Sequence, residues 1–101
     1  MQNIIPYLSA ETIKQQLSPL DFYQEEISLE STCEHGWVDG GLCPFHDDSR
    51  AGNFRVNLDF GGFTCFACGE KGGDFIAFLM QREGLNFPET LRYLNEHYGV
   101  G

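Results

Sequence analysis

Two stretches decide the fold of this chain: Cys43-Pro44-Phe45-His46 and Cys65-Phe66-Ala67-Cys68. Each places two metal-binding side chains with two residues between them, a spacing that lets one tight turn direct both side chains at one ion. Two such turns supply the four ligands of the tetrahedral shell that Zn²⁺ prefers. The eighteen residues between His46 and Cys65 leave room for a two-stranded excursion that brings the pairs together. We therefore predict one structural zinc ion held by Cys43, His46, Cys65 and Cys68.

Other interpretations of these residues are disfavoured by the sequence. Four cysteines permit two disulfides, but a Cys-x-x-Cys pair in a reducing compartment favours metal binding. A catalytic zinc needs an open coordination position, which four good ligands close, and a deaminase needs His-x-Glu where this chain has His46-Asp47-Asp48. Cys33 and His35 are spare potential ligands. We interpret them as a strand thiol and a turn imidazole, with a transient role as substitute ligands as the alternative.

Length and charge limit the function further. With 101 residues the chain fits one domain, and a domain of this size often needs a metal to stabilise it. Its 15 acidic residues against 6 Lys and Arg oppose tight, autonomous binding to nucleic acid. The sequence has neither an apolar run of membrane-helix length nor the features of a signal peptide. We therefore expect a cytoplasmic protein without a membrane partner.

The first two thirds of the chain contain helix signals and then strand signals. A helix is expected over about residues 10–17, and Ser18-Pro19 is a second start signal, so residues 10–26 form one bent helix or two short ones. Residues 27–66 are expected to form strands and turns, beginning with the alternating stretch 27–29. The alternation over 53–58, a turn at 59–62 and a return strand over 63–65 together predict a β-hairpin.

After the second Cys pair the pattern becomes helical. Asp74 can cap a helix that runs from Phe75 to about Glu83, with Gly84 just past its end. Asn86 can cap a final helix, with Glu89 in the capping-box position. Four residues then recur at helical spacing and are predicted to pack in the core: Phe87, Leu91, Leu94 and Tyr98.

With these residues placed, the chain resembles the Cys-His-Cys-Cys zinc finger of DnaG-type bacterial and phage DNA primases. The resemblance covers roughly residues 36–95 and is specific, because its sequence blocks occur together and in order. These blocks are Gly41 to Asp48, Phe54 to Val56, Cys65 to Gly69, Gly72 to Ile76, Phe78 to Met80, and Leu85 to Glu89.

The resemblance implies an α+β fold of the zinc-ribbon type, in which a small antiparallel β-sheet has flanking N- and C-terminal helices. It implies a single domain over residues 1–101, with the finger core at about 36–95 and an N-terminal helical extension over 1–26. In that family the finger lies ahead of a separate polymerase domain, engages single-stranded template and helps set where primer synthesis begins. The same four ligands are implied by the family pattern.

The chain departs from the family in three respects. It ends at Gly101 without the polymerase domain, so no autonomous activity is expected, and primer synthesis would need a separate polymerase domain. The family's usual Thr-Pro-Ser-Phe stretch appears here as Arg50-Ala51-Gly52-Asn53-Phe54. Family members also generally carry more Lys and Arg around the finger.

The leading functional prediction is a primase-type module that binds single-stranded DNA weakly and assists primer synthesis. Its expected partners are a separate primase polymerase subunit, a helicase or another replication protein. Candidate phosphate contacts are Arg50, Arg55 and Lys71, and candidate stacking residues are Trp37, Phe63 and Phe66. Core packing is the competing interpretation of both Phe residues. The alternative function is an acidic protein-interaction or regulatory module that docks a replication enzyme or mimics nucleic acid.

Overall fold

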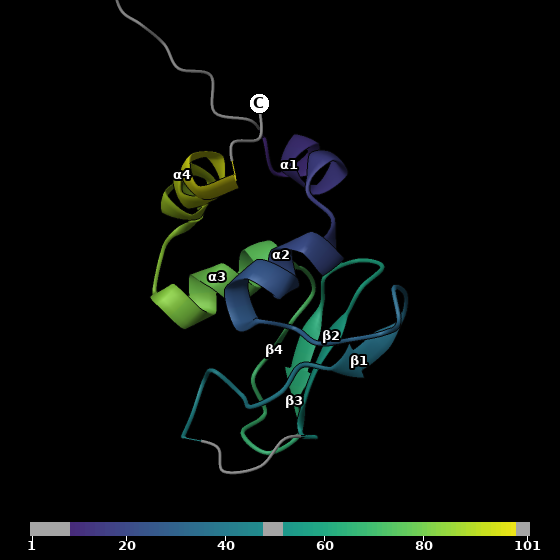
Figure 1. The fold of residues 1–101 in the computed structure, drawn as a ribbon. Coiled ribbons are helices and arrows are strands. Elements are labelled where there is room, and N and C mark those ends of the chain that lie inside the picture. The colour runs from purple at the N-terminus through teal and green to yellow at the C-terminus, as the bar shows by residue number, and fades with distance from the viewer. Residues whose placement is uncertain (1–8, 48–51, 99–101) are drawn as a thin grey trace, which may run out of the picture.

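The computed structural model describes residues 9–47 and 52–98, and Figure 1 shows their arrangement. Over these residues the chain forms one antiparallel sheet, with strands in sequence order, and helices before and after it. The helices are α1 (Ala10–Gln16), α2 (Pro19–Ile27), α3 (Phe75–Glu83) and α4 (Phe87–Tyr98). The strands are β1 (Trp37–Asp39), β2 (Phe54–Asn57), β3 (Phe63–Cys65) and β4 (Lys71–Gly72). The α+β prediction is confirmed.

The N-terminal segment forms two short helices rather than one bent helix. The Ser18 hydroxyl accepts a hydrogen bond from the backbone N–H of Asp21 at 3.1 Å, and Pro19 takes the first position of α2. The helix then continues to Ile27 and ends at Ser28, which has a left-handed φ of 53°. The expectation that residues 27–29 alternate as a strand is therefore wrong, because Ile27 still belongs to α2.

The predicted hairpin is present between β2 and β3. Val56 pairs with Phe63, and the turn closes where the Gly61 N–H donates to the Asn57 carbonyl at 2.8 Å. Alternation along these strands directs Phe54, Val56 and Phe63 into the core. The opposite side of the sheet, which we call the outer face, carries residues such as Arg55 and Thr64.

Both C-terminal helices begin where their caps predict. The Asp74 carboxylate accepts from the Ala77 N–H at 2.8 Å, and α3 ends at Gly84, which has a φ of +69°. At the start of α4 the Asn86 side chain accepts from the Glu89 N–H at 2.8 Å, while Glu89 accepts from the Asn86 N–H at 2.9 Å. None of the helices in the described part of the chain is long and apolar enough to cross a bilayer.

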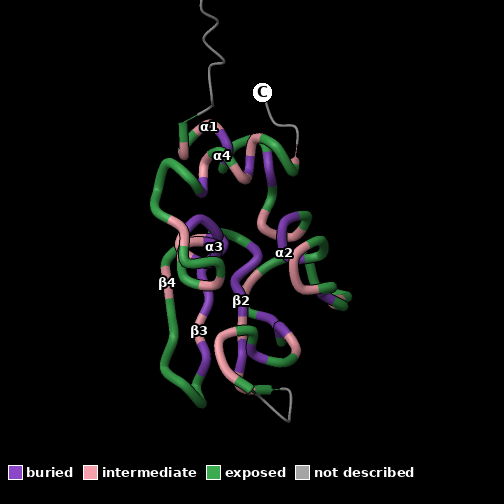
Figure 2. The backbone as a smooth tube through the Cα atoms, turned by 90° about the vertical axis from the view of Figure 1, so that its left-hand side faces the viewer, coloured by how far each residue is buried: buried purple, intermediate pink, exposed green. Residues whose placement is uncertain are grey.

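The largest fully buried side chains are aromatic rings that the sheet, α2 and α3 contribute. Figure 2 shows the buried residues of these elements in purple. Phe78 lies at its centre, with edge-to-face contacts to Tyr23, Phe45 and Phe63 at centroid distances of 5.3 to 5.5 Å. Burying each such ring stabilises the fold by roughly 1.5–3 kcal/mol. On α4 Leu94 is fully buried, but Phe87 is 45% exposed, so the prediction that Phe87 packs in the core is wrong.

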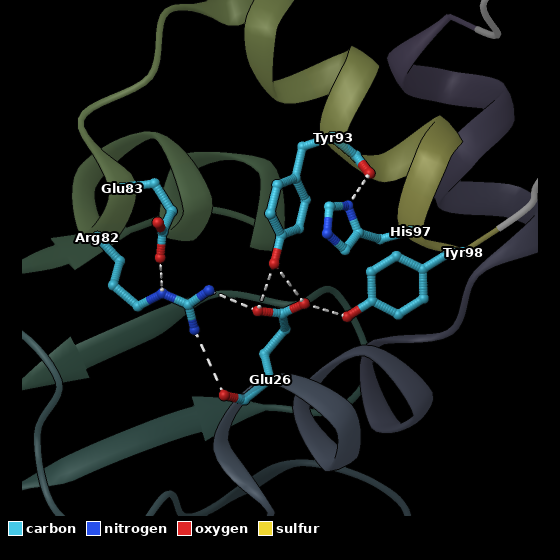
Figure 3. A network of polar contacts seen from close by, with 6 residues as sticks. All are labelled: Glu26, Arg82, Glu83, Tyr93, His97 and Tyr98. Carbon is cyan, nitrogen blue, oxygen red and sulfur yellow. Dashed lines mark hydrogen bonds and ion pairs between the residues drawn. The ribbon is translucent and has the colours of Figure 1, made fainter.

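A polar network attaches α4 to α2 and α3 (Figure 3). The Glu26 carboxylate, which is 7% exposed, accepts a charged hydrogen bond from Arg82. The hydroxyls of Tyr93 and Tyr98 donate to the same carboxylate. Burial and the nearby Glu26 raise the pKa of both Tyr hydroxyls, so they stay protonated and serve as donors. The buried charge is thus fully compensated, as burial of an ion requires.

Candidate metal centre

The four predicted zinc ligands lie together at one end of the sheet. The donor atoms of Cys43, His46, Cys65 and Cys68 are all within 4.8 Å of one another. The Sγ atoms of Cys43 and Cys68 are 3.8 Å apart. A tetrahedral ion with Zn–S bonds of about 2.3 Å separates its ligand atoms by about 3.8 Å. The donor set and its spacing therefore fit one zinc ion.

Each ligand pair sits on a tight turn, and we call these turns the first knuckle (residues 43–46) and the second knuckle (residues 65–68). In the first knuckle the Phe45 N–H donates to the Cys43 Sγ at 3.4 Å. The second knuckle begins at Cys65, the last residue of β3, and the Gly69 N–H closes it by donating to the Cys65 carbonyl at 2.9 Å. Gly69 has a φ of +84°, a conformation that glycine adopts without strain.

The ligands differ in exposure because the knuckles meet at the edge of the core. Cys43 and Cys65 are 4% and 1% exposed, while His46 is half-buried and Cys68 is exposed. Phe45, between the two ligands of the first knuckle, points inward and stacks on Phe63. The hydrophobic core therefore supports the metal site from beneath.

The surroundings of the thiols show why the site needs a cation. Burial raises the pKa of the Cys43 thiol to about 12. Burial also acts on Cys65, but the backbone N–H groups of Cys68 and Ala67 outweigh it, so the pKa of Cys65 lies below its usual value. The fold thus favours the thiolate of Cys65 over that of Cys43, and a bound metal ion would offset the charge that burial opposes at Cys43.

The chemistry of this site is structural rather than catalytic. Four protein ligands complete the tetrahedral shell and leave no open position for a substrate or an activated water. Cys33 and His35 lie apart from this cluster. Cys33 lies in an exposed loop and not in a strand as expected, and the His35 Nδ1 atom is 3.0 Å from the Asp59 carboxylate.

Comparison with known proteins agrees with the ligand geometry. The chain matches the family described as the CHC2 zinc finger, the DnaG zinc ribbon, over residues 5–101. The chain belongs to the CHC2 zinc finger family. The family match and the Cys-His-Cys-Cys cluster together establish one structural zinc ion as its cofactor.

The family's relatives are DNA primases. The chain is 34% identical to a DNA primase of Enterococcus faecalis over 99% of its own length, and 32% identical to one of Thermotoga maritima over 96%. Its fold resembles the crystal structure of the Aquifex aeolicus primase (zinc-binding and RNA polymerase domains), with a TM-score of 0.68 and 27% identity over 93% of this chain. The chain spans 15%, 16% and 23% of these proteins, respectively. The matched family is a zinc finger, a non-catalytic part of a primase.

The structure brings three of the six predicted DNA-contact residues onto one surface. Trp37, Arg55 and Lys71 lie on the outer face, where Arg55 pairs with Thr64 and Thr64 pairs with Lys71 across the strands. Phe66 is 73% exposed on the second knuckle. Phe63 is 1% exposed, so it is a core residue and cannot offer a ring face to a base. Arg50 lies outside the described residues.

One aromatic residue on this surface was missed from the sequence. Phe60, at the tip of the β2–β3 turn, is 52% exposed and contacts Trp37 edge-to-face at a centroid distance of 5.8 Å. The available signal was the turn at residues 59–62 itself, because a large apolar side chain at a hairpin tip rarely reaches the core.

Proposed function

We propose that this zinc finger contacts single-stranded DNA template through the outer face of its sheet and so assists primer synthesis by a polymerase domain. The carrying observation is the position of Arg55 and Lys71, which flank Thr64 in one row across β2, β3 and β4. Lys and Arg side chains contact the phosphates of a strand, and exposed aromatics beside them stack on bases. The primase relatives supply the class of reaction.

The distribution of charge also supports this face. Among the described Lys and Arg residues, Lys14 pairs with Asp74 at 3.0 Å and Arg82 pairs with Glu26 and Glu83. No ion pair within the described ranges involves Arg55, Lys71 or Arg92. Of these three cations, Arg55 and Lys71 lie on the outer face. The net charge of −9 repels phosphate and weakens binding, but salt screens those charges that lie more than a Debye length of about 8 Å from the contact.

The test is a titration of the zinc-loaded protein with fluorescent single-stranded DNA at two salt concentrations. We expect weak binding whose log–log dependence on salt has a slope of about 1.4, since each of the two outer-face cations neutralises one phosphate and each neutralised phosphate contributes about 0.7. Arg55→Glu and Lys71→Glu should weaken binding more than Arg92→Glu, which makes the same charge change on the exposed side of α4. Equal weakening by all three variants, or no binding at low salt, would contradict the proposal.

A second candidate function is docking onto a basic surface of a replication enzyme such as a polymerase domain or helicase. Residues 15–49 contain no Lys or Arg, and exposed carboxylates follow one another along α2 and the loop after it, at Asp21, Glu25, Glu30 and Glu34. If this function holds, Glu25→Lys should abolish binding to a purified primase polymerase domain or helicase, while Arg55→Glu should leave that binding intact.

A further inference from the structure

A groove of about 600 Å³ opens on the outer face beside the predicted DNA contacts. Its lining includes Trp37, Phe60, Thr64, Lys71 and Gly73, and we call it the aromatic groove. We infer that the aromatic groove holds one unpaired nucleobase of the bound strand, with Phe60 as a stacking residue that the sequence did not reveal. This inference rests on the proposed function, because it names the part of the DNA that the outer face recognises.

The groove is open because two residues of the outer face, Gly62 and Gly73, carry no side chain. One row of residues crosses the sheet from Trp37 to its partner Asn57 and then to Gly62, whose carbonyl accepts from the Asn57 N–H at 2.8 Å. Gly73, just after β4, lies next to Gly62 and extends this row. A Cβ atom at Gly73 would meet nothing within 4 Å, so the space above it is open. A Cβ atom at Gly62 would lie 2.4 Å from the Phe60 ring, so that ring rests directly on the glycine backbone.

The walls of the groove are held in place without a ligand. The Asn57 side chain, which is 4% exposed, accepts from the backbone N–H of Phe60 at 3.1 Å and from that of Asp59 at 2.8 Å. The turn that carries Phe60 is therefore fixed from within. The planes of the Trp37 and Phe60 rings stand at 85° to each other and form a corner. Such preorganisation lowers the entropy cost of binding a flat ligand.

The positive charges at the rim favour a base that carries phosphate groups over an uncharged apolar ligand. Lys71 lines the groove, and Arg55 lies two strands away in the same row. The nearby carboxylates are engaged with the protein: Asp59 accepts from the Gly36 N–H at 3.0 Å and lies 3.0 Å from the His35 Nδ1 atom, and Asp39 accepts from the Gly41 N–H at 2.9 Å. A base on the aromatic corner thus leaves its phosphates near two cations.

Trp37 is the single tryptophan of the chain, so its fluorescence reports on the aromatic groove directly. We expect zinc-loaded protein to show quenched Trp37 emission with a short oligothymidylate, and much less quenching with an abasic strand of equal length. Phe60→Ala should weaken oligothymidylate binding at least about fivefold, since stacking contributes about 1–3 kcal/mol per base. Phe87→Ala removes an exposed aromatic on α4, outside the groove, and serves as the matched control.

A second variant tests the open space itself. Gly73→Val places methyl groups where the structure has room and should reduce binding by filling the groove, provided that its thermal melt matches that of the unmodified protein. If Phe60→Ala binds oligothymidylate as tightly as Phe87→Ala and Trp37 emission does not change, the groove is not a base site, although the proposed function stands. If no strand binds at low salt, both fail. Quenching by a protein partner without any by DNA would assign the groove to protein docking and overturn the inference.

Discussion

The ring of Phe45 stacks on the ring of Phe63, with centroids 5.4 Å apart and ring planes 24° apart. Phe45 belongs to the first knuckle, and Phe63 begins the strand that ends in Cys65. The contact therefore links one ligand pair to the strand that carries the other. We therefore expect the metal centre and the hydrophobic core to unfold as one cooperative unit.

This link predicts that Phe45→Ala lowers both stability and zinc affinity. Deleting a core Phe side chain costs about 3–5 kcal/mol, and we expect the lower end because Phe45 is only partly buried. The check is thermal unfolding of zinc-loaded protein together with competition against a metal chelator. Phe66→Ala, in the second knuckle but 73% exposed, should change neither measurement appreciably. Equal effects of the two variants would contradict the link.

Replacement of a buried ligand should unfold the domain. Structural zinc contributes apparent energies of about 10–16 kcal/mol in finger peptides, which is comparable to or larger than the typical stability of about 5–15 kcal/mol of a whole domain. We expect Cys65→Ser to lose zinc by elemental analysis and to lose its cooperative melt. Cys33→Ser, at an exposed thiol outside the cluster, should keep both. A cooperative melt with full zinc content in Cys65→Ser would show that the ion is dispensable.

Zinc binding should release protons and weaken as the solution is acidified. Burial raises the pKa of Cys43 to about 12, so without a bound ion this thiol is protonated at neutral pH and must lose its proton to bind zinc. Lower pH favours the protonated thiols and hence zinc loss. Calorimetry of zinc uptake in two buffers of different ionisation enthalpy measures the released protons. An affinity that does not change with pH would contradict thiolate coordination.

The buried carboxylate beneath α4 should be one of the most sensitive polar positions. Glu26→Ala leaves Arg82 largely buried without its main partner and removes the acceptor of two Tyr hydroxyls. Breaking a buried ion pair in this way costs about 3–5 kcal/mol. Glu25→Ala, at the adjacent exposed position, should stay within about 0.5 kcal/mol of the unmodified protein in denaturant unfolding. Similar midpoints for the two variants would mean that α4 is held by apolar contacts alone.

The sequence predicted those features that short-range chemistry determines. Asp74 and Gly84 fixed the ends of α3, Asn86 and Glu89 formed their capping box, and the knuckle spacing identified all four ligands. Features that depend on distant residues were not predictable in this way. Whether Phe87 or Phe63 is buried depends on which side of its helix or strand faces the core. The partner of Glu26, Arg82, is 56 residues away in the sequence.

That long separation has a consequence for the order in which the chain folds. The knuckles join residues only 25 positions apart, whereas the hydroxyl of Tyr98 reaches Glu26 across 72 positions. Closing a longer loop costs more chain entropy, and contacts between distant residues generally form more slowly. We therefore expect the zinc-bound hairpin to nucleate folding and α4 to dock last. Interactions that form after the transition state govern the unfolding rate, so the Glu26 network would set how long the native domain persists.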